Sequence, residues 1–176
     1  MSPRLKSRIA GGFYVLAVVT AIAGEGFLRG RLAYAIGLIA VACFVVVTLV
    51  VYFLFKPVSS GLSFLATLSG LIGLSLEALE LHFRGANIAL IFHGLYCILI
   101  GLLILRSAFL PRAVGALMLI GGLAWLTDLS IPLTNHLAPY NVAVGFLGEG
   151  LSMLWLLIVG VNAQRWNEQE RAARAS

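Results

Sequence analysis

The sequence predicts an all-α integral membrane bundle of six transmembrane helices, and three observations support this fold class. Hydrophobic residues make up 61% of the chain and charged residues 11%, whereas soluble domains have about half and about a quarter. The mean hydropathy is +1.03. The 176 residues divide into apolar segments of roughly the 20 residues that a membrane-spanning helix needs, and these lack the alternation of β-barrel strands. A soluble globule, a disulfide-rich domain and a disordered chain are therefore excluded.

Six apolar segments follow one another along the chain, and each is long enough to cross about 30 Å of hydrocarbon as a helix. They cover residues 9–28, 32–55, 58–81, 86–105, 110–129 and 142–162. The breaks between them hold charged residues, glycines and prolines, in order Arg29-Gly30-Arg31, Lys56-Pro57, Arg84-Gly85, Arg106 with Pro111-Arg112, and a polar stretch from Pro132 to Asn141. Two of these prolines, Pro57 and Pro111, stand where the first turn of a helix tolerates proline. We therefore predict a single transmembrane domain over residues 1–176.

The last segment, residues 163–176, is a short polar tail. It mixes Arg and Glu residues with Trp166. We expect a cytoplasmic, solvated helical extension in which the tryptophan is an aromatic anchor at the membrane interface.

The basic residues predict the orientation of the bundle. With the N-terminus inside, nine of the twelve Lys and Arg residues face the cytoplasm, and only Arg29, Arg31 and Arg84 face outward. By the positive-inside rule, both termini are predicted in the cytoplasm. The pI of about 9.7 follows from these same loops, so no nucleic-acid partner is expected.

The sequence lacks the short motifs of soluble enzymes. It has no CxxC, HExxH, GxSxG, Walker loop or dinucleotide-binding glycine pattern. No catalytic or cofactor-binding residue is predicted on this basis, and a non-enzymatic role is favoured. The two cysteines, Cys43 and Cys97, fall near the middle of the second and fourth helices and are interpreted as small packing residues.

Acidic residues gather at the outer helix ends. Five of the seven acids lie there, namely Glu25, Glu77, Glu80, Asp128 and Glu149. A rise of about 1.5 Å per residue places Glu77, His93 and Glu149 roughly 7 to 10 Å below the outer surface. Because an ionised side chain that faces lipid costs about 2.5 to 3.5 kcal/mol, these three should face the bundle interior, with Glu149 buried near His93. The candidate buried polar cluster is Glu25, Glu77, His93 and Glu149.

The sequence leaves the role of this cluster open. It is either an interhelical hydrogen-bond network that fixes packing or a functional site, since ionisable groups inside membranes are functional by default. A bound metal is a further alternative, but the Glu-x-x-His pair of bundle-core metal sites is missing. His93 and Cys97 share a helix face at four-residue spacing, which alone is weak evidence for zinc. Glu80 and Arg84 have the spacing of a helical ion pair and are interpreted as structural.

Three stretches carry a family resemblance. They are Phe92-His93-Gly94-Leu95, the loop Arg106-Ser107-Ala108-Phe109-Leu110-Pro111-Arg112, and Gly148-Glu149 followed by Leu154-Trp155-Leu156-Leu157. With these motifs, and with Lys56-Pro57-Val58 earlier in the chain, the sequence resembles the bacterial domain of unknown function 4386 family over most of its length. The resemblance implies a multi-pass bacterial inner-membrane protein with no assigned reaction. It also implies that Glu25 and Glu149 are family positions, without giving them a role.

Three classes of function remain. A bundle this small is best interpreted as a structural or accessory subunit of a membrane assembly. The first alternative is a small-molecule or ion binder, or a transporter, that uses the outer Glu and His residues. The second alternative is a metal-dependent membrane hydrolase. The expected partners are the lipid bilayer and either a second copy of the chain or a larger membrane complex.

Overall fold

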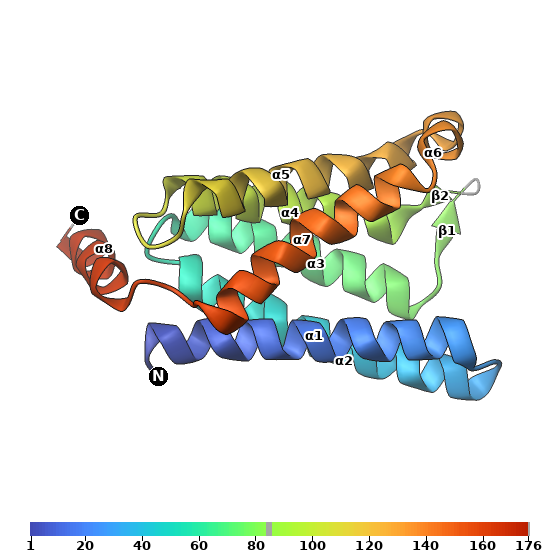
Figure 1. Cartoon of the computed structure of the whole chain (residues 1–176), viewed down its shortest axis with the longest axis horizontal. Helices are drawn as coiled ribbons and strands as arrows, with labels where there is room; N and C mark the ends of the chain where they lie inside the picture. The colour runs from blue at the N-terminus through green and yellow to red at the C-terminus, as the bar shows by residue number, and fades with distance from the viewer. Residues whose placement is uncertain (84–85, 176) are drawn as a thin grey trace.

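The protein is a bundle of long helices in a computed structural model that describes residues 1–83 and 86–175, with the backbone alone at residues 25, 82, 83 and 86 (Figure 1). The long helices are α1 (Pro3–Phe27), α2 (Arg31–Phe55), α3 (Ser60–Ala78), α4 (Ile88–Arg106), α5 (Arg112–Trp125) and α7 (Tyr140–Ile158). The shorter elements are β1 (His82–Phe83), β2 (Ala86–Asn87), the 3-10 helix η1 (Leu126–Leu129), α6 (Ile131–Leu137) and α8 (Ala163–Ala175). The predicted all-α class is confirmed, since β1 and β2 form only a two-residue antiparallel ladder.

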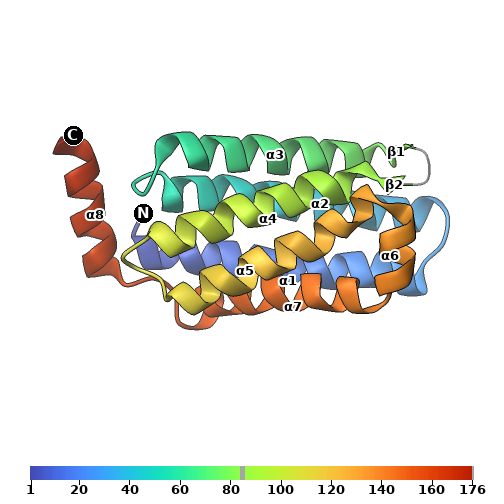
Figure 2. The same cartoon turned by 90° about the horizontal axis from the view of Figure 1, so that it is seen from above.

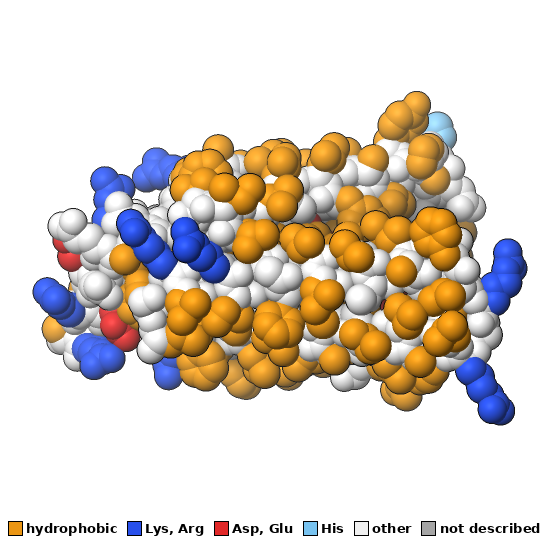
Figure 3. Space-filling model, turned by 60° about the horizontal axis from the view of Figure 1, so that its bottom comes forward, with side chains coloured by type: hydrophobic (Ala, Val, Ile, Leu, Met, Phe, Trp, Pro, Cys, Tyr) orange, Lys and Arg blue, Asp and Glu red, His pale blue; other side chains and the backbone are white. Residues whose placement is uncertain are grey.

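Within the described residues, six helices are long and apolar enough to cross a membrane. The fifth combines α5 with η1 and covers Arg112–Leu129. Both chain ends lie at the same end of the bundle (Figure 1). Figure 3 shows hydrophobic side chains over the middle of one face, with Lys and Arg at both ends and more of them at the end that carries the termini. This distribution is typical of a bundle that exposes its sides to lipid.

Local capping fixes several helix ends. The Ser2 and Ser59 hydroxyl oxygens accept hydrogen bonds from the backbone N–H groups of Leu5 and Leu62, at 3.3 and 3.4 Å, as N-cap residues do. Just after the C-terminal end of α7, Gly160 has a φ of +75°, and its N–H donates to the carbonyl of Trp155 at 2.9 Å. A left-handed glycine here ends the helix. The helix predicted over 142–162 therefore ends early, at Ile158, and the predicted helical tail follows as α8.

The predicted segment 58–81 also ends early. Helix α3 stops at Ala78, and Glu80 has a left-handed φ of 51°. Glu80 therefore lies outside the helix, so the prediction that Glu80 and Arg84 form an ion pair along one helix is wrong. Arg84 itself lies outside the described residues. Glu77 consequently sits in the last turn of α3, nearer the end of the bundle than the rise per residue suggested.

The six long helices form a closed ring. Each packs against the next along the chain, and α7 packs against both α5 and α1, which closes the circle (Figure 2). At the end that carries the termini, large side chains fill the interior of the ring. The largest of these are fully buried and include Leu54, Phe55, Leu103, Ile104, Met118 and Met153.

The neighbours α4, α5 and α7 approach one another at glycines. A Cβ atom placed on Gly122 of α5 would lie 2.8 Å from the carbonyl oxygen of Gly94 in α4, and one on Gly101 of α4 would lie 2.9 Å from that of Gly115 in α5. A Cβ on Gly148 of α7 would collide with the carbonyl oxygen of Leu117 in α5. Small residues permit such backbone contact between membrane helices. This side of the ring is therefore packed backbone to backbone.

Helix α8 docks across the filled end of the bundle. Trp166 is buried, and its indole N–H donates to the carbonyl of Leu54 at 2.8 Å. The ammonium nitrogen of Lys6 lies 4.7 Å from the centre of the Trp166 ring. The expectation of an interfacial tryptophan anchor is therefore wrong, because this ring is used to attach α8 to α1 and α2.

Candidate functional site

A histidine and a glutamate from different helices meet inside the ring. Helix α4 carries His93 and α7 carries Glu149, and the His93 Nε2 atom lies 2.9 Å from a carboxylate oxygen of Glu149. The Glu149 side chain is 3% exposed and that of His93 19%. A buried carboxylate away from water requires a charged or hydrogen-bonding partner. The imidazole supplies that partner, as the sequence led us to expect.

Aromatic rings surround the imidazole. The ring centres of Phe44 and Trp125 lie 6.0 Å from that of His93, both edge to face, and the Tyr96 ring lies at 6.1 Å. Tyr14 of α1, which is also buried, lies close enough to Glu149 for its hydroxyl to interact with the carboxylate. These rings make the surroundings of the pair largely apolar, which strengthens the electrostatic interaction between its members.

Cys97 lies beside this pair. It is one helical turn after His93 on α4 and fully buried. One ligating atom from each of His93, Cys97 and Glu149 lies within 4.8 Å of the other two. Nitrogen, sulfur and carboxylate oxygen are the ligands that transition metals use in proteins. Cys97 was interpreted from the sequence as a packing residue, although its four-residue spacing from His93 was the signal that could have placed it here.

A cavity of about 550 Å³ opens next to His93, at the end of the bundle away from the termini. All six long helices contribute to its lining, and about half of the lining residues belong to α1, α2 and the loop between them. Apolar side chains form its walls, among them Val18, Ile22, Leu38, Phe44, Leu74 and Leu90. His93, Trp125 and Glu149 line the same cavity from α4, α5 and α7.

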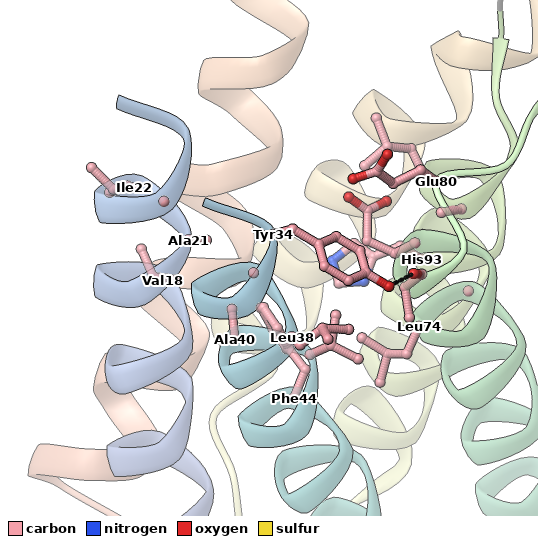
Figure 4. Close-up of a pocket in the computed structure, with 18 of the residues that line it drawn as sticks. Val18, Ala21, Ile22, Tyr34, Leu38, Ala40, Phe44, Leu74, Glu80 and His93 are labelled. Carbon is pink, nitrogen blue, oxygen red and sulfur yellow. Dashed lines mark hydrogen bonds between the residues drawn. The ribbon is translucent and has the colours of Figure 1, made fainter. Parts of the chain in front are cut away.

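Two acids and a tyrosine lie at the rim of this cavity. Figure 4 shows Tyr34 reaching across the cavity, with His93 behind its ring and Glu80 above it. The Tyr34 hydroxyl donates to the carbonyl of Ala78 at 3.2 Å. Glu77, in the last turn of α3, also lines the cavity and is exposed.

The four residues of the predicted cluster therefore differ in place. The structure brings His93 and Glu149 into contact, whereas Glu77 lines the same cavity from its rim. The side chain of Glu25 lies outside the described residues. Tyr14 and Cys97 adjoin the pair, and no local pattern around Tyr14 could have indicated its position. The geometry is that of an apolar cavity with carboxylates at its rim and a His–Glu pair at its floor.

A hydrolytic site would also need a nucleophile. Ser152 is the buried serine on the helix of Glu149, but its hydroxyl donates to the carbonyls of Gly148 and Val114, at 2.8 and 3.2 Å. The bond to Gly148 lies within α7 and the bond to Val114 joins α7 to α5, so the hydroxyl serves helix packing. Ser152 therefore does not supply the membrane-hydrolase alternative with a free nucleophile beside Glu149.

The residues at the floor of the cavity lie in a segment that this chain shares with a known protein family. A family model described as a domain of unknown function, DUF4386, matches residues 73–160. This segment includes Glu77, His93, Cys97 and Glu149. An uncharacterized protein of Archaeoglobus fulgidus is 30% identical over 127 residues, an alignment that covers 66% of this chain and 76% of that protein. No solved structure matches the chain significantly.

Proposed function

We propose that this chain, which belongs to the DUF4386 family, is a multi-pass membrane protein that binds a small cationic amphiphile inside its helical ring. The single observation that carries the proposal is the cavity, with apolar walls, carboxylates at the rim and the His93–Glu149 pair at the floor. The family description assigns no activity, so the proposal depends on this chain's own geometry.

The size of the cavity favours a ligand over a purely structural role. Protein interiors are packed about as densely as organic crystals, with few voids larger than a water molecule. A cavity of about 550 Å³ is within the range of ligand pockets, roughly 300 to 1,000 Å³. An accessory subunit needs only a packed bundle and a docking surface. The accessory-subunit interpretation, which the sequence favoured, does not explain why the bundle has this cavity.

The lining favours a cation. Among the described residues it includes Glu77, Glu80 and Glu149 but neither Lys nor Arg. Carboxylates around a cleft with low-dielectric walls concentrate cations. Phe44, Trp125 and Phe146 also line the cavity, and aromatic rings can stabilise an ammonium group by cation–π interaction. The apolar walls would hold the hydrocarbon part of the ligand.

We also propose an orientation for the cavity. The sequence assigns nine basic residues to the side of the termini and three to the opposite side, which supports cytoplasmic termini in a cell inner membrane and a cavity that opens outward. Single cysteines at Ser2 and Asn135 should react with a membrane-impermeant reagent from opposite sides. Reaction of both from the same side would overturn this orientation.

The binding proposal is tested with two ions of the same shape and opposite charge. Tetraphenylphosphonium and tetraphenylborate are titrated into the purified protein in a non-ionic detergent, and heat of binding is measured after subtraction of partition into empty micelles. We expect saturable binding of the phosphonium ion alone. Glu77→Gln should lower its affinity several-fold, whereas Glu168→Gln, on α8 far from the cavity, should not.

Two results would reject the proposal. Equal binding of both ions would show an unselective apolar surface, and absence of saturable binding would show that the cavity takes no such ligand. The second result, combined with co-purification of a defined membrane complex, would restore the accessory-subunit interpretation.

A further inference from the structure

We propose that His93, Cys97 and Glu149 form a binding site for one transition-metal ion of the zinc class at the floor of the cavity. The inference uses the same floor as the proposed function, but it does not depend on an organic ligand. Its carrying observation is the convergence of an imidazole, a thiol and a carboxylate from two helices that are distant in the sequence.

The separation of the ligating atoms suits one ion. Zinc binds nitrogen and oxygen at about 2.0 to 2.2 Å and sulfur at about 2.3 Å, so two ligands of one ion lie no more than roughly 4.5 Å apart. The atoms of His93, Cys97 and Glu149 lie within 4.8 Å of one another. On metal binding, the 2.9 Å distance between the His93 nitrogen and the Glu149 oxygen would have to increase by a few tenths of an ångström. A small rotation of these side chains is enough for that change.

Charge also favours a divalent ion. The site is deeply buried, with Cys97 fully covered and Glu149 3% exposed. A divalent cation, a thiolate, a carboxylate and a neutral imidazole sum to zero charge, which a low-dielectric interior tolerates best. Binding would release the Cys97 thiol proton and any proton on the imidazole, since metal ligands must be deprotonated. Every formal charge in the site is thereby balanced.

The donor set indicates which metals fit. Thiolate and imidazole favour zinc and similar ions over magnesium or calcium, which prefer oxygen ligands. His93 and Glu149 line the cavity, so a fourth coordination position would face it. Three protein ligands with one open position are typical of zinc sites that bind a further molecule.

The second cysteine supplies a matched control for the experiment. Cys43 is buried, like Cys97, but it lies on α2 and does not belong to the cluster. Cobalt(II) is titrated into the full chain, purified in detergent and treated with a chelator that is then removed. Near-ultraviolet absorption reports thiolate-to-cobalt charge transfer, and visible absorption reports the coordination geometry.

We expect one equivalent of cobalt to produce a charge-transfer band that zinc then removes by competition. Cys97→Ser and Cys97→Ala should abolish this band, whereas Cys43→Ser should retain it. Glu149→Gln should weaken cobalt binding at least tenfold. Size-exclusion profiles identify any variant that has lost its fold. If one of the two Cys97 variants does not fold, the other still tests the role of the thiol.

The inference would be overturned by wild-type protein that binds no cobalt, or by a band that persists in folded Cys97→Ser. Failure of the metal site is distinguishable from failure of the proposed function. Tetraphenylphosphonium binding is measured in metal-free protein, so it can persist when cobalt binding is absent. Conversely, cobalt binding without phosphonium binding would reject the proposed function and leave the metal site standing.

Discussion

The two sides of the helical ring are built differently. On the side of α4, α5 and α7, glycines bring backbones so close that Cβ atoms at Gly122 and Gly148 would meet carbonyl oxygens. The hairpin of α1 and α2 also approaches α7 closely at Gly11, where a Cβ would lie 2.7 Å from the backbone nitrogen of Leu157. Farther along, toward the end away from the termini, this hairpin supplies about half of the cavity lining, and a Cβ on Gly37 of α2 would meet no described atom within 4 Å. The close-packed side holds His93 and Glu149 in fixed positions. The hairpin side leaves room beside them.

Because its two sides are built differently, this small membrane bundle can keep both a precise polar pair and an open space. Direct backbone packing leaves few alternative arrangements, so α4 and α7 keep a fixed rotation relative to each other. At the cavity rim, Tyr34 of α2 reaches α3 through one hydrogen bond, from its hydroxyl to the carbonyl of Ala78. We therefore expect substitutions on the close-packed side to change stability and those on the hairpin side to change ligand binding.

The largest effect is expected at Gly148. A Cβ there would meet the carbonyl oxygen of Leu117 and lie 3.0 Å from the Cα atom of Gly121, and backbone atoms cannot give way. Gly148→Ala should lower the free energy of unfolding by about 1 to 3 kcal/mol, as overpacking does. Denaturant unfolding in mixed micelles, followed by circular dichroism, measures it.

The control lies on the same helix. No described atom lies within 4 Å of a Cβ placed on Gly150, so Gly150→Ala should leave the free energy of unfolding unchanged or raise it by up to about 1 kcal/mol through helix propensity. Equal losses from both substitutions would show that backbone contact between α5 and α7 does not set the stability of this side.

The second prediction concerns the hairpin side. Gly37 of α2 lines the cavity, and a Cβ placed there meets no described atom within 4 Å. Gly37→Phe should fill part of the cavity, which would lower the affinity for tetraphenylphosphonium at least tenfold, or about 1.4 kcal/mol. The free energy of unfolding should not fall, because the ring enters open space.

Gly61→Phe is the control for this substitution. A Cβ placed on Gly61 of α3 also meets no described atom within 4 Å, but Gly61 does not line the cavity. This variant should bind the ion normally. Unimpaired binding by Gly37→Phe would mean that the ion occupies another place.

The smallest effect is expected at Tyr34. Removing its hydroxyl deletes a half-exposed hydrogen bond at the cavity rim, which contributes no more than about 1 kcal/mol. Tyr34→Phe should hardly change the free energy of unfolding but should speed release of the bound ion several-fold, because one connection between α2 and α3 is lost. Stopped-flow dilution measures release. Tyr140→Phe, at an exposed tyrosine that does not line the cavity, should leave the rate unchanged, and equal rates in both variants would contradict a rim role for Tyr34.

Local chemistry determined most of the predicted fold. Hydrocarbon requires long apolar helices whose backbone bonds are internal, so composition and segment length were enough to predict six of them. The helix ends were less predictable. The helix predicted over residues 142–162 ends at Ile158 instead, because Gly160 adopts a left-handed conformation. Glu77 was placed too deep because α3 was expected to continue to residue 81 and ends at Ala78.

From the residues alone it follows that Glu149 needs a partner inside the bundle, because an isolated charge in hydrocarbon is too costly. Which groups surround Glu149 depends on how the helices pack. Tyr14 on α1, the neighbours His93 and Cys97 on α4, and Glu149 on α7 come from three helices far apart in the chain. Their side chains converge because each helix has one particular rotation about its axis. Those rotations depend on glycine contacts among α4, α5 and α7, and on how α1 and α2 close the ring. Such contacts link residues by their position in space, which the spacing of residues along a single helix does not specify.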